Sequence, residues 1–136
     1  MRRIGLLLTA PALLAGCSDG GDRSHLAHTS WRFVRIDGQQ PSSPAAGLTF
    51  EKGNIGVQVG CNRMGGPWRV DENRLFAGPL SQSEMACADP AWSQEKAVGA
   101  LLVATPRMSV EGDRMTLQSS GHTAELVRQE EGRKGG

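Results

Sequence analysis

NIGVQVGCNRMGG, residues 54–66, joins an alternating strand to a glycine-rich turn. In its first half Ile55, Val57 and Val59 alternate with glycine and polar residues, which is the period-2 pattern of a half-buried strand. Its second half, residues 60–66, holds three glycines, which are typical of a bent strand and a tight turn. The stretch therefore predicts a sheet whose chain bends sharply after a half-buried strand.

Strand patterns continue on both sides of this stretch, separated by glycine-containing or polar turn sequences such as Asp37-Gly38. We expect strands at residues 30–36, 48–51, 54–59, 68–70, 74–76, 108–110, 115–117 and 123–128.

One segment departs from the strand pattern. Asp89 and Pro90 supply a helix N-cap and a proline at the first helical position, and apolar residues then recur at helical spacing up to Pro106. This predicts a helix of about four turns, with an apolar face for the sheet. We expect Trp92, in its first turn, to pack in the core.

The beginning of the chain resembles an export signal. Arg2 and Arg3 precede an apolar run of eleven residues, 4–14, which is shorter than the roughly 20 residues of a membrane-spanning helix. The sequence LAGC at residues 14–17 resembles the lipobox of bacterial lipoproteins, in which the cysteine receives a diacylglycerol and becomes the new N-terminus. We expect a signal peptide at 1–16 and acylation of Cys17; an ordinary signal peptide beside a chance cysteine is the alternative.

Acylation of Cys17 implies a firm attachment to a membrane, because two or three acyl chains bind a membrane stably, whereas a single chain binds it only weakly. Aspartate directly after the anchor resembles an inner-membrane retention signal in Gram-negative lipoproteins, and here Ser18 stands there while Asp19 follows. We therefore expect the protein in the cell envelope, on the outer membrane facing the periplasm if the host is Gram-negative.

The 136 residues leave room for one domain. We expect a lipidated cysteine and flexible tether at 17–28, the domain at 29–128 and a disordered tail at 129–136. Without Arg2 and Arg3 the 15 basic residues fall to 13, against 14 acidic ones. With no basic cluster in the sequence, this balance argues against nucleic-acid binding and against a polybasic membrane reader. We expect a monomer.

The cysteines Cys61 and Cys87 remain after acylation of Cys17. A catalytic thiol would need a base, and nothing in the sequence brings His122, the domain's own histidine, near either cysteine. A redox pair would need close Cys-x-x-Cys spacing, and a structural zinc site would need four ligands. An even number of thiols in an oxidising compartment favours a structural disulfide between Cys61 and Cys87.

Other polar residues of the domain have modest expected roles. The glycine-rich run at 60–66 lacks the ending of a phosphate-binding P-loop. We expect Asn62 to bond backbone groups across its turn, Arg63 to be solvated, and Glu95, on or beside the buried helix face, to reach a backbone amide or the core edge. No second carboxylate at defined spacing suggests acid–base catalysis, so we expect no enzyme, cofactor or metal.

Two motifs carry a family resemblance: GCNRMGG at 60–66 and SEMAC at 83–87, just before the predicted helix. With Trp31 and Glu95 they resemble the META domain family, whose bacterial members include HslJ-like heat-shock lipoproteins. The resemblance covers residue 31 to about residue 128. Ser83 and Glu84 stand where the family usually has threonine and a basic residue, and Trp68 and Met108 stand at places where tyrosine is common.

Taken with this resemblance, the element order predicts an α+β fold: a strongly bent, mostly antiparallel sheet of about eight short strands with one helix packed in its concavity. The resemblance also implies a non-catalytic role in envelope stress tolerance through binding. Its motif residues form the candidate binding surface: Gly60, Asn62, Arg63, Ser83, Met85 and Glu95.

Three function classes remain distinguishable by structure. A module that binds an envelope protein predicts an exposed apolar or aromatic patch. A lipid or small-molecule carrier, the alternative reading, requires a cavity of about 300 Å³ or more between sheet and helix. An enzyme requires convergent polar groups with shifted pKa values in a cleft. We expect the first class and a packed interior.

Overall fold

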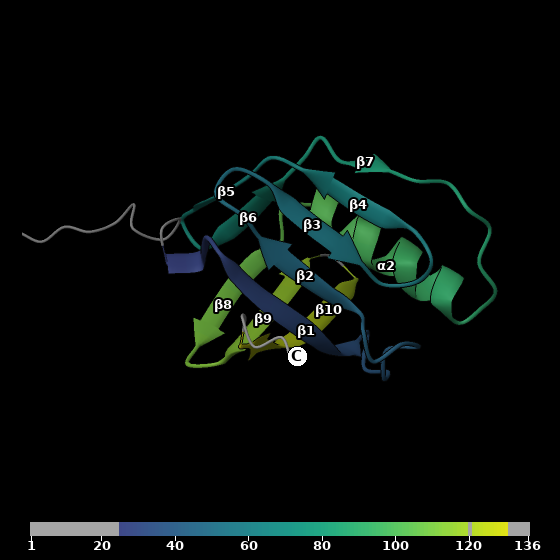
Figure 1. Cartoon of the computed structure of the whole chain (residues 1–136). Helices are drawn as coiled ribbons and strands as arrows, with labels where there is room; N and C mark the ends of the chain where they lie inside the picture. Colours follow the sequence, from purple (N-terminus) through teal and green to yellow (C-terminus); the bar gives the residue numbers. More distant parts are fainter. Residues whose placement is uncertain (1–24, 120, 131–136) are drawn as a thin grey trace, which may run out of the picture.

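The computed structural model describes residues 25–119 and 121–130 (Figure 1). The predicted signal peptide at 1–16, Cys17 and most of the predicted tether lie outside the described residues. Within the described ranges, no helix has the length and apolar character needed to cross a membrane.

The described chain forms ten strands and one long helix. In chain order the elements are β1 (Thr29–Ile36), β2 (Gly47–Phe50), β3 (Ile55–Gln58), β4 (Arg63–Gly66), β5 (Trp68–Asp71), β6 (Arg74–Ala77), β7 (Ser81–Gln82), α2 (Ala91–Val103), β8 (Arg107–Glu111), β9 (Arg114–Ser119) and β10 (His122–Gln129). The predicted α+β class is confirmed, and all eight expected strands and the helix are present.

Two strands were not expected from the sequence, so the sheet has ten strands rather than eight. β4 reads Arg-Met-Gly-Gly and β7 has two residues, and neither sequence favours a strand by itself. They are strands because of their neighbours: Gly65 of β4 pairs with Gly56 of β3 on one side and with Ser81 of β7 on the other.

A single antiparallel sheet contains all ten strands, in the order β5-β6-β8-β9-β10-β1-β2-β3-β4-β7. Only Pro67 separates β4 from β5, although these strands stand near opposite ends of that order. The two ends must therefore approach each other, and the sheet curls into a half-barrel (Figure 1). The rings of Phe50 in β2 and Trp68 in β5, six places apart in the order, lie 4.7 Å from centre to centre.

The helix α2 lies in the concavity of this half-barrel and packs against β1, β6, β9 and β10 (Figure 1). Val98, Leu101 and Leu102 are almost fully buried on its inner face. The sheet supplies the facing apolar side chains, which are also buried: Trp31, Phe33, Leu75, Met115, Leu117, Ala124 and Leu126. Among the described residues, buried apolar side chains thus line both the helix and the sheet where the two elements pack together.

The start of α2 differs from the expectation in two ways. Pro90, not Asp89, is the N-cap residue, and the Asp89 carboxylate accepts instead from the backbone N–H (3.0 Å) and the hydroxyl (2.7 Å) of Ser93. The prediction that Trp92 packs in the core is wrong, because its side chain is 37% exposed. Trp92 leaves the core because the buried face of the helix is occupied by Glu95 and the apolar residues that follow it at helical spacing.

The domain is slightly longer than its predicted bounds. Leu26, assigned from the sequence to the flexible tether, is 5% exposed and belongs to the core, and His28 donates its N–H to the carbonyl of Phe50 (2.6 Å). At the other end Gln129 continues β10 and pairs with Ser30 of β1. A single apolar residue in a polar segment has no periodicity, so the sequence could not place Leu26 in the core.

Candidate functional site

The two motifs, GCNRMGG at 60–66 and SEMAC at 83–87, meet at the side chain of Asn62, which is 1% exposed. Its carbonyl oxygen accepts from the N–H of Met85 (2.7 Å) and the hydroxyl of Ser83 (3.0 Å). Its Nδ2 donates to the carbonyl of Met85 (2.9 Å) and to Oε2 of Glu95 (2.7 Å). These four bonds use the full capacity of an amide side chain. Asn62 does bond backbone groups, but in the segment before the helix rather than across its own turn.

Glu95 reaches the same cluster from the second turn of α2 and is 1% exposed. Its Oε1 accepts from the backbone N–H of Asn62 (3.2 Å), which confirms the expected bond to a backbone amide. Its Oε2 accepts from the side-chain amide of Gln82 (3.2 Å) as well as from Asn62. A buried carboxylate is tolerated when N–H groups surround it in this way, so the arrangement is a structural one.

Gly60 allows the end of β3 to approach the helix closely. A Cβ atom at this position would lie 2.8 Å from Oε1 of Glu95 and 3.0 Å from the carbonyl of Ala91. Any side chain here would push β3 away from α2 and break the bonds of Glu95. The glycine is therefore required by packing against the helix.

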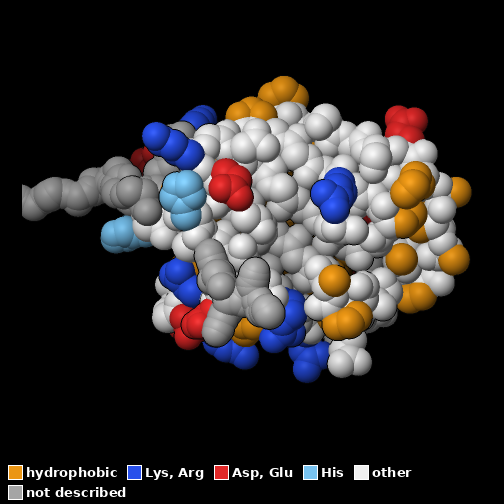
Figure 2. Space-filling model, viewed as in Figure 1, with side chains coloured by type: hydrophobic (Ala, Val, Ile, Leu, Met, Phe, Trp, Pro, Cys, Tyr) orange, Lys and Arg blue, Asp and Glu red, His pale blue; other side chains and the backbone are white. Residues whose placement is uncertain are grey.

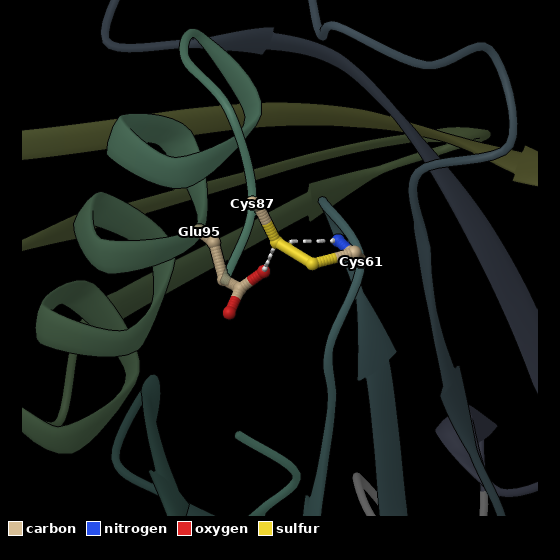
Figure 3. A group of neighbouring side chains, drawn as sticks. All are labelled: Cys61, Cys87 and Glu95. Carbon is tan, nitrogen blue, oxygen red and sulfur yellow. Dashed lines mark hydrogen bonds between the residues drawn. A yellow bond between two sulfur atoms is a disulfide. The ribbon is translucent and has the colours of Figure 1, made fainter. Parts of the chain in front are cut away.

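Cys61 and Cys87 form a disulfide, as predicted, with Cα atoms 6.0 Å apart (Figure 3). The backbone N–H of Cys61 points at Sγ of Cys87 (3.3 Å), and Oε1 of Glu95 lies 3.7 Å from the same sulfur. The two sulfurs and the Glu95 carboxylate lie within 4.8 Å of one another, a spacing that a metal ion could bridge. Disulfide sulfurs are not thiolates, however, and this carboxylate is already bonded to amides, so the donor set does not fit a metal ion.

The disulfide and the residues Gly60, Asn62, Gln82, Ser83 and Glu95 form one cluster, which we call the Asn62 cluster. It fixes the backbone of residues 83–87, which lies outside the strands and helices of the described chain. Arg63 contributes its backbone N–H to Oγ of Ser83 (3.0 Å), while its side chain is exposed to solvent, as expected.

Two large apolar side chains project into solvent near the Asn62 cluster. Met85 is 52% exposed and Trp92 is 37% exposed. The ammonium of Lys96 lies 5.5 Å from the centre of the Trp92 ring. Figure 2 shows hydrophobic side chains gathered on the side of the molecule where Figure 1 places the start of α2 and the segment before it. We call Met85 and Trp92 with their surroundings the apolar patch.

The domain's histidine lies in a different environment from the cysteines. His122 Nδ1 is 2.8 Å from the carboxylate of Asp37, whose other oxygen accepts the N–H of Thr123 (2.9 Å). Burial raises the pKa of Asp37, but the hydrogen bonds from His122 and Thr123 and the charge of His122 outweigh it, so its pKa lies below the ordinary 3.8. His122 thus contacts a carboxylate rather than a thiol.

Two side-chain amides were missed by the sequence analysis, that of the exposed Gln82 and that of the buried Gln94. Gln82 donates to Glu95, and Gln94 links α2 to the loop after β1 through the N–H of Ser42 (2.8 Å) and the carbonyl of Gln40 (2.8 Å). Gln94 and Glu95 are adjacent polar residues within the helical run of apolar ones. Polar residues at buried-face positions are a signal of specific hydrogen bonds, and that signal could have identified Gln94.

Comparison with known proteins gives a family and a fold. The family model of the META domain matches residues 24–131. No curated protein matches the chain. An NMR structure of a protein from Burkholderia xenovorans is similar with a TM-score of 0.68 and 23% identity, covering 94% of this chain and 100% of that one. A second NMR structure has a TM-score of 0.69 and 18% identity, covering 77% of this chain and 92% of that one. At these identities the two structures show a shared fold.

Proposed function

Because this chain belongs to the META domain family, we propose that it is a non-catalytic binding module that docks a protein partner in the cell envelope. In this proposal Cys17 carries a lipid anchor, and the monomeric domain faces the periplasm from the outer membrane of a Gram-negative host. The module contributes to envelope stress tolerance by holding its partner rather than by turnover.

The observation that carries the proposal is the exposure of Met85 and Trp92 next to a rigid backbone. A large aromatic residue left outside the core is typical of the centre of a protein interface. Asn62 holds both the N–H and the carbonyl of Met85, so the backbone below this side chain is fixed before any partner arrives. A preorganised surface loses less conformational entropy on binding, which increases affinity.

The lipid anchor is supported by the LAGC sequence at residues 14–17. Eight residues lie between Cys17 and Leu26, the first core residue, and an extended chain over these nine Cα–Cα steps spans about 30 Å. The apolar patch could therefore meet partners close to the membrane surface. The alternative of a lipid carrier needs a cavity between sheet and helix, and the described residues on both sides of that interface are buried apolar side chains.

The proposal is tested by photo-crosslinking in the intact envelope of the native host. A photoreactive amino acid at position 85 or 92 should give a discrete crosslinked protein species, because both side chains face solvent within the apolar patch. Val110 on β8 is similarly exposed, at 41%, and serves as the matched control position that should give no such species.

A further variant tests the contact itself. Trp92→Ala should remove most of the crosslinking from position 85 while leaving the melting temperature within a few degrees, since Trp92 is not part of the core. Equal crosslinking from positions 85, 92 and 110, or none from any of them, would contradict a docking function of this patch.

A further inference from the structure

We propose that a hollow between β6, β8, β9 and the end of α2 binds a phosphate group through Arg74 and Arg107. The hollow measures about 360 Å³ and is lined by Arg74, Ala104, Arg107, Gln118 and Ser119. The hollow is separate from the Asn62 cluster and the apolar patch, and the proposal that it binds phosphate does not depend on the proposed docking function.

The sheet places the two arginines directly opposite each other. Arg74 and Arg107 are the residue pair through which β6 meets β8. Two backbone hydrogen bonds flank this pair, from Leu75 N–H to Pro106 O (2.9 Å) and from Met108 N–H to Asn73 O (2.7 Å). Such a pair is of the non-hydrogen-bonded type, in which the opposed side chains stand closest, with Cα atoms about 4.5 Å apart. Both guanidinium groups therefore leave the same face of the sheet side by side.

Neither arginine has a carboxylate partner among the described residues. Asp71 is opposite Arg74 in the β5–β6 hairpin, but its carboxylate pairs with Arg69 (3.8 Å). Like charges directly opposite each other destabilise a sheet. An anion between Arg74 and Arg107 would turn this repulsion into attraction.

The surroundings of the pair suit an anion. Arg74 donates one N–H to the carbonyl of Thr105 (2.9 Å), which anchors the guanidinium and leaves four of its five N–H donors for other partners. Gln118, opposite Arg107 on β9, adds an amide donor, while the hydroxyl of Ser119, which also lines the hollow, donates to the carbonyl of Leu101 (3.5 Å). None of the described residues that line the hollow carries a carboxylate.

The size and the donor geometry favour phosphate over a smaller anion. At about 30 Å³ each, roughly ten water molecules would fill the hollow, so a phosphate group enters without displacing the protein. Guanidinium groups present paired N–H donors that match phosphate oxygens, and two such groups balance a charge near −2. The phosphate can belong to a free ion or to a phospholipid headgroup, because both expose the same oxygens.

The first experiment titrates the chain from Ser18 to Gly136 with inorganic phosphate at constant ionic strength and follows backbone amides by NMR. Amides of Gln118 and Ser119 should shift with a dissociation constant in the millimolar range, about 4 kcal/mol of binding free energy. Arg107→Gln should weaken this binding about tenfold by removing a charge-assisted contact. Arg114→Gln removes the same charge from an exposed position on β9 outside the hollow and should leave the binding within twofold.

The second experiment distinguishes the two sources of phosphate with the same chain, which lacks the anchor. If Arg107→Gln reduces cosedimentation with phosphatidylglycerol vesicles more than Arg114→Gln does, the ligand is a lipid headgroup. Phosphate binding without vesicle binding identifies a free phosphate. Either result supports the site.

Thermal melting separates a binding defect from a folding defect. Phosphate should raise the melting temperature of the unmodified chain, and Arg107→Gln should abolish that rise without lowering the melting temperature in phosphate-free buffer, because it also removes the repulsion. Equal effects of Arg107→Gln and Arg114→Gln in both binding experiments, or neither phosphate nor vesicle binding by the unmodified chain, would overturn the proposal.

Discussion

At the scale of single residues, the side chain of Asn62 connects three parts of the chain. It reaches the segment before the helix at Ser83 and Met85, 21 and 23 residues away, and the helix itself at Glu95, 33 residues away. The bond to Glu95 is fully buried, and the bonds to Ser83 and Met85 are partly buried. Leaving a buried polar group without its partner lowers the free energy of unfolding by more than the hydrogen bond contributed to it. The Asn62 cluster is therefore sensitive to single substitutions.

Asn62→Ala should lower the free energy of unfolding by about 2–4 kcal/mol, since it leaves Glu95 and the backbone of Met85 with unpaired buried groups. Urea denaturation measures this change. Arg63→Ala, the neighbouring substitution of an exposed side chain, should change stability by no more than about 0.5 kcal/mol. Similar effects of both substitutions would show that the Asn62 cluster does not stabilise the domain.

Asp37 gives the domain an acid-sensitive contact. Its pKa is lower in the folded chain than the ordinary 3.8, so the folded state binds fewer protons at low pH than the unfolded state. The stabilisation is therefore present above pH 3.8 and is lost as the pH falls through the lowered pKa. Asp37→Asn should lower the melting temperature at neutral pH and have no effect once the pH is well below the lowered pKa of Asp37.

Melting curves between neutral and acidic pH follow this difference. Glu84→Gln removes an exposed carboxylate and serves as the control, with the same melting temperature as the unmodified chain throughout. A difference between Asp37→Asn and the unmodified chain that stays constant down to pH 2 would contradict the assignment.

At the scale of elements, the β3–β4 turn is linked twice to the chain that follows it, by the hydrogen bonds of the Asn62 cluster and by the disulfide of the same cluster. The disulfide joins the residue after Gly60 to Cys87, 26 positions later, just before α2. The loop between them includes β4, β5, β6 and β7, so the bond limits the freedom of four strands in the unfolded chain.

Cys61→Ser should lower the free energy of unfolding by about 3.5 kcal/mol, the chain-entropy estimate for closing a loop of this length. The double variant Cys61→Ser, Cys87→Ser should lose about the same amount, because either change opens the same loop. Denaturation of the three proteins without reductant measures both losses. A single variant as stable as the unmodified chain, or free thiols found in the unfolded unmodified chain, would contradict this prediction.

At the scale of the whole molecule, the chain combines a curled domain with an N-terminal segment that the sequence assigns to export and anchoring. Residue 26 is already in the core, so the predicted tether runs from Cys17 to His25 at most. In the proposed anchored form, this short tether would keep both the apolar patch and the phosphate hollow within reach of the membrane.

We predict that the mature protein begins at Cys17 and carries a diacylglycerol there. Intact-mass measurement of the protein extracted from membranes should give the mass of residues 17–136 plus the lipid. Cys17→Ser should release the domain from the membrane or stall its processing, because the acceptor thiol is missing. An unlipidated mature species, or one that starts elsewhere, would contradict the prediction.

The sequence alone determined the features that depend on local pattern or on a small number of choices. The alternation around Ile55 predicted a strand, and the apolar spacing after Pro90 predicted the helix, because side chains repeat every 2 residues in strands and every 3.6 in helices. The pairing of Cys61 with Cys87 was predicted because only two cysteines remain once Cys17 is assigned to acylation and the domain to an oxidising compartment, and the structure contains this disulfide.

Only the tertiary structure decided the features that depend on partners far away in the chain. The glycine-rich β4 is a strand because β3 and β7 supply its hydrogen bonds, and Asn62 is buried because a helix 33 residues later brings Glu95 to it. Arg74 and Arg107 are also 33 residues apart in the sequence, and no local pattern indicates that they lie opposite each other in the sheet. Strand register and side-chain burial arise when the sheet curls and closes over the helix, and local propensity contains no information about either.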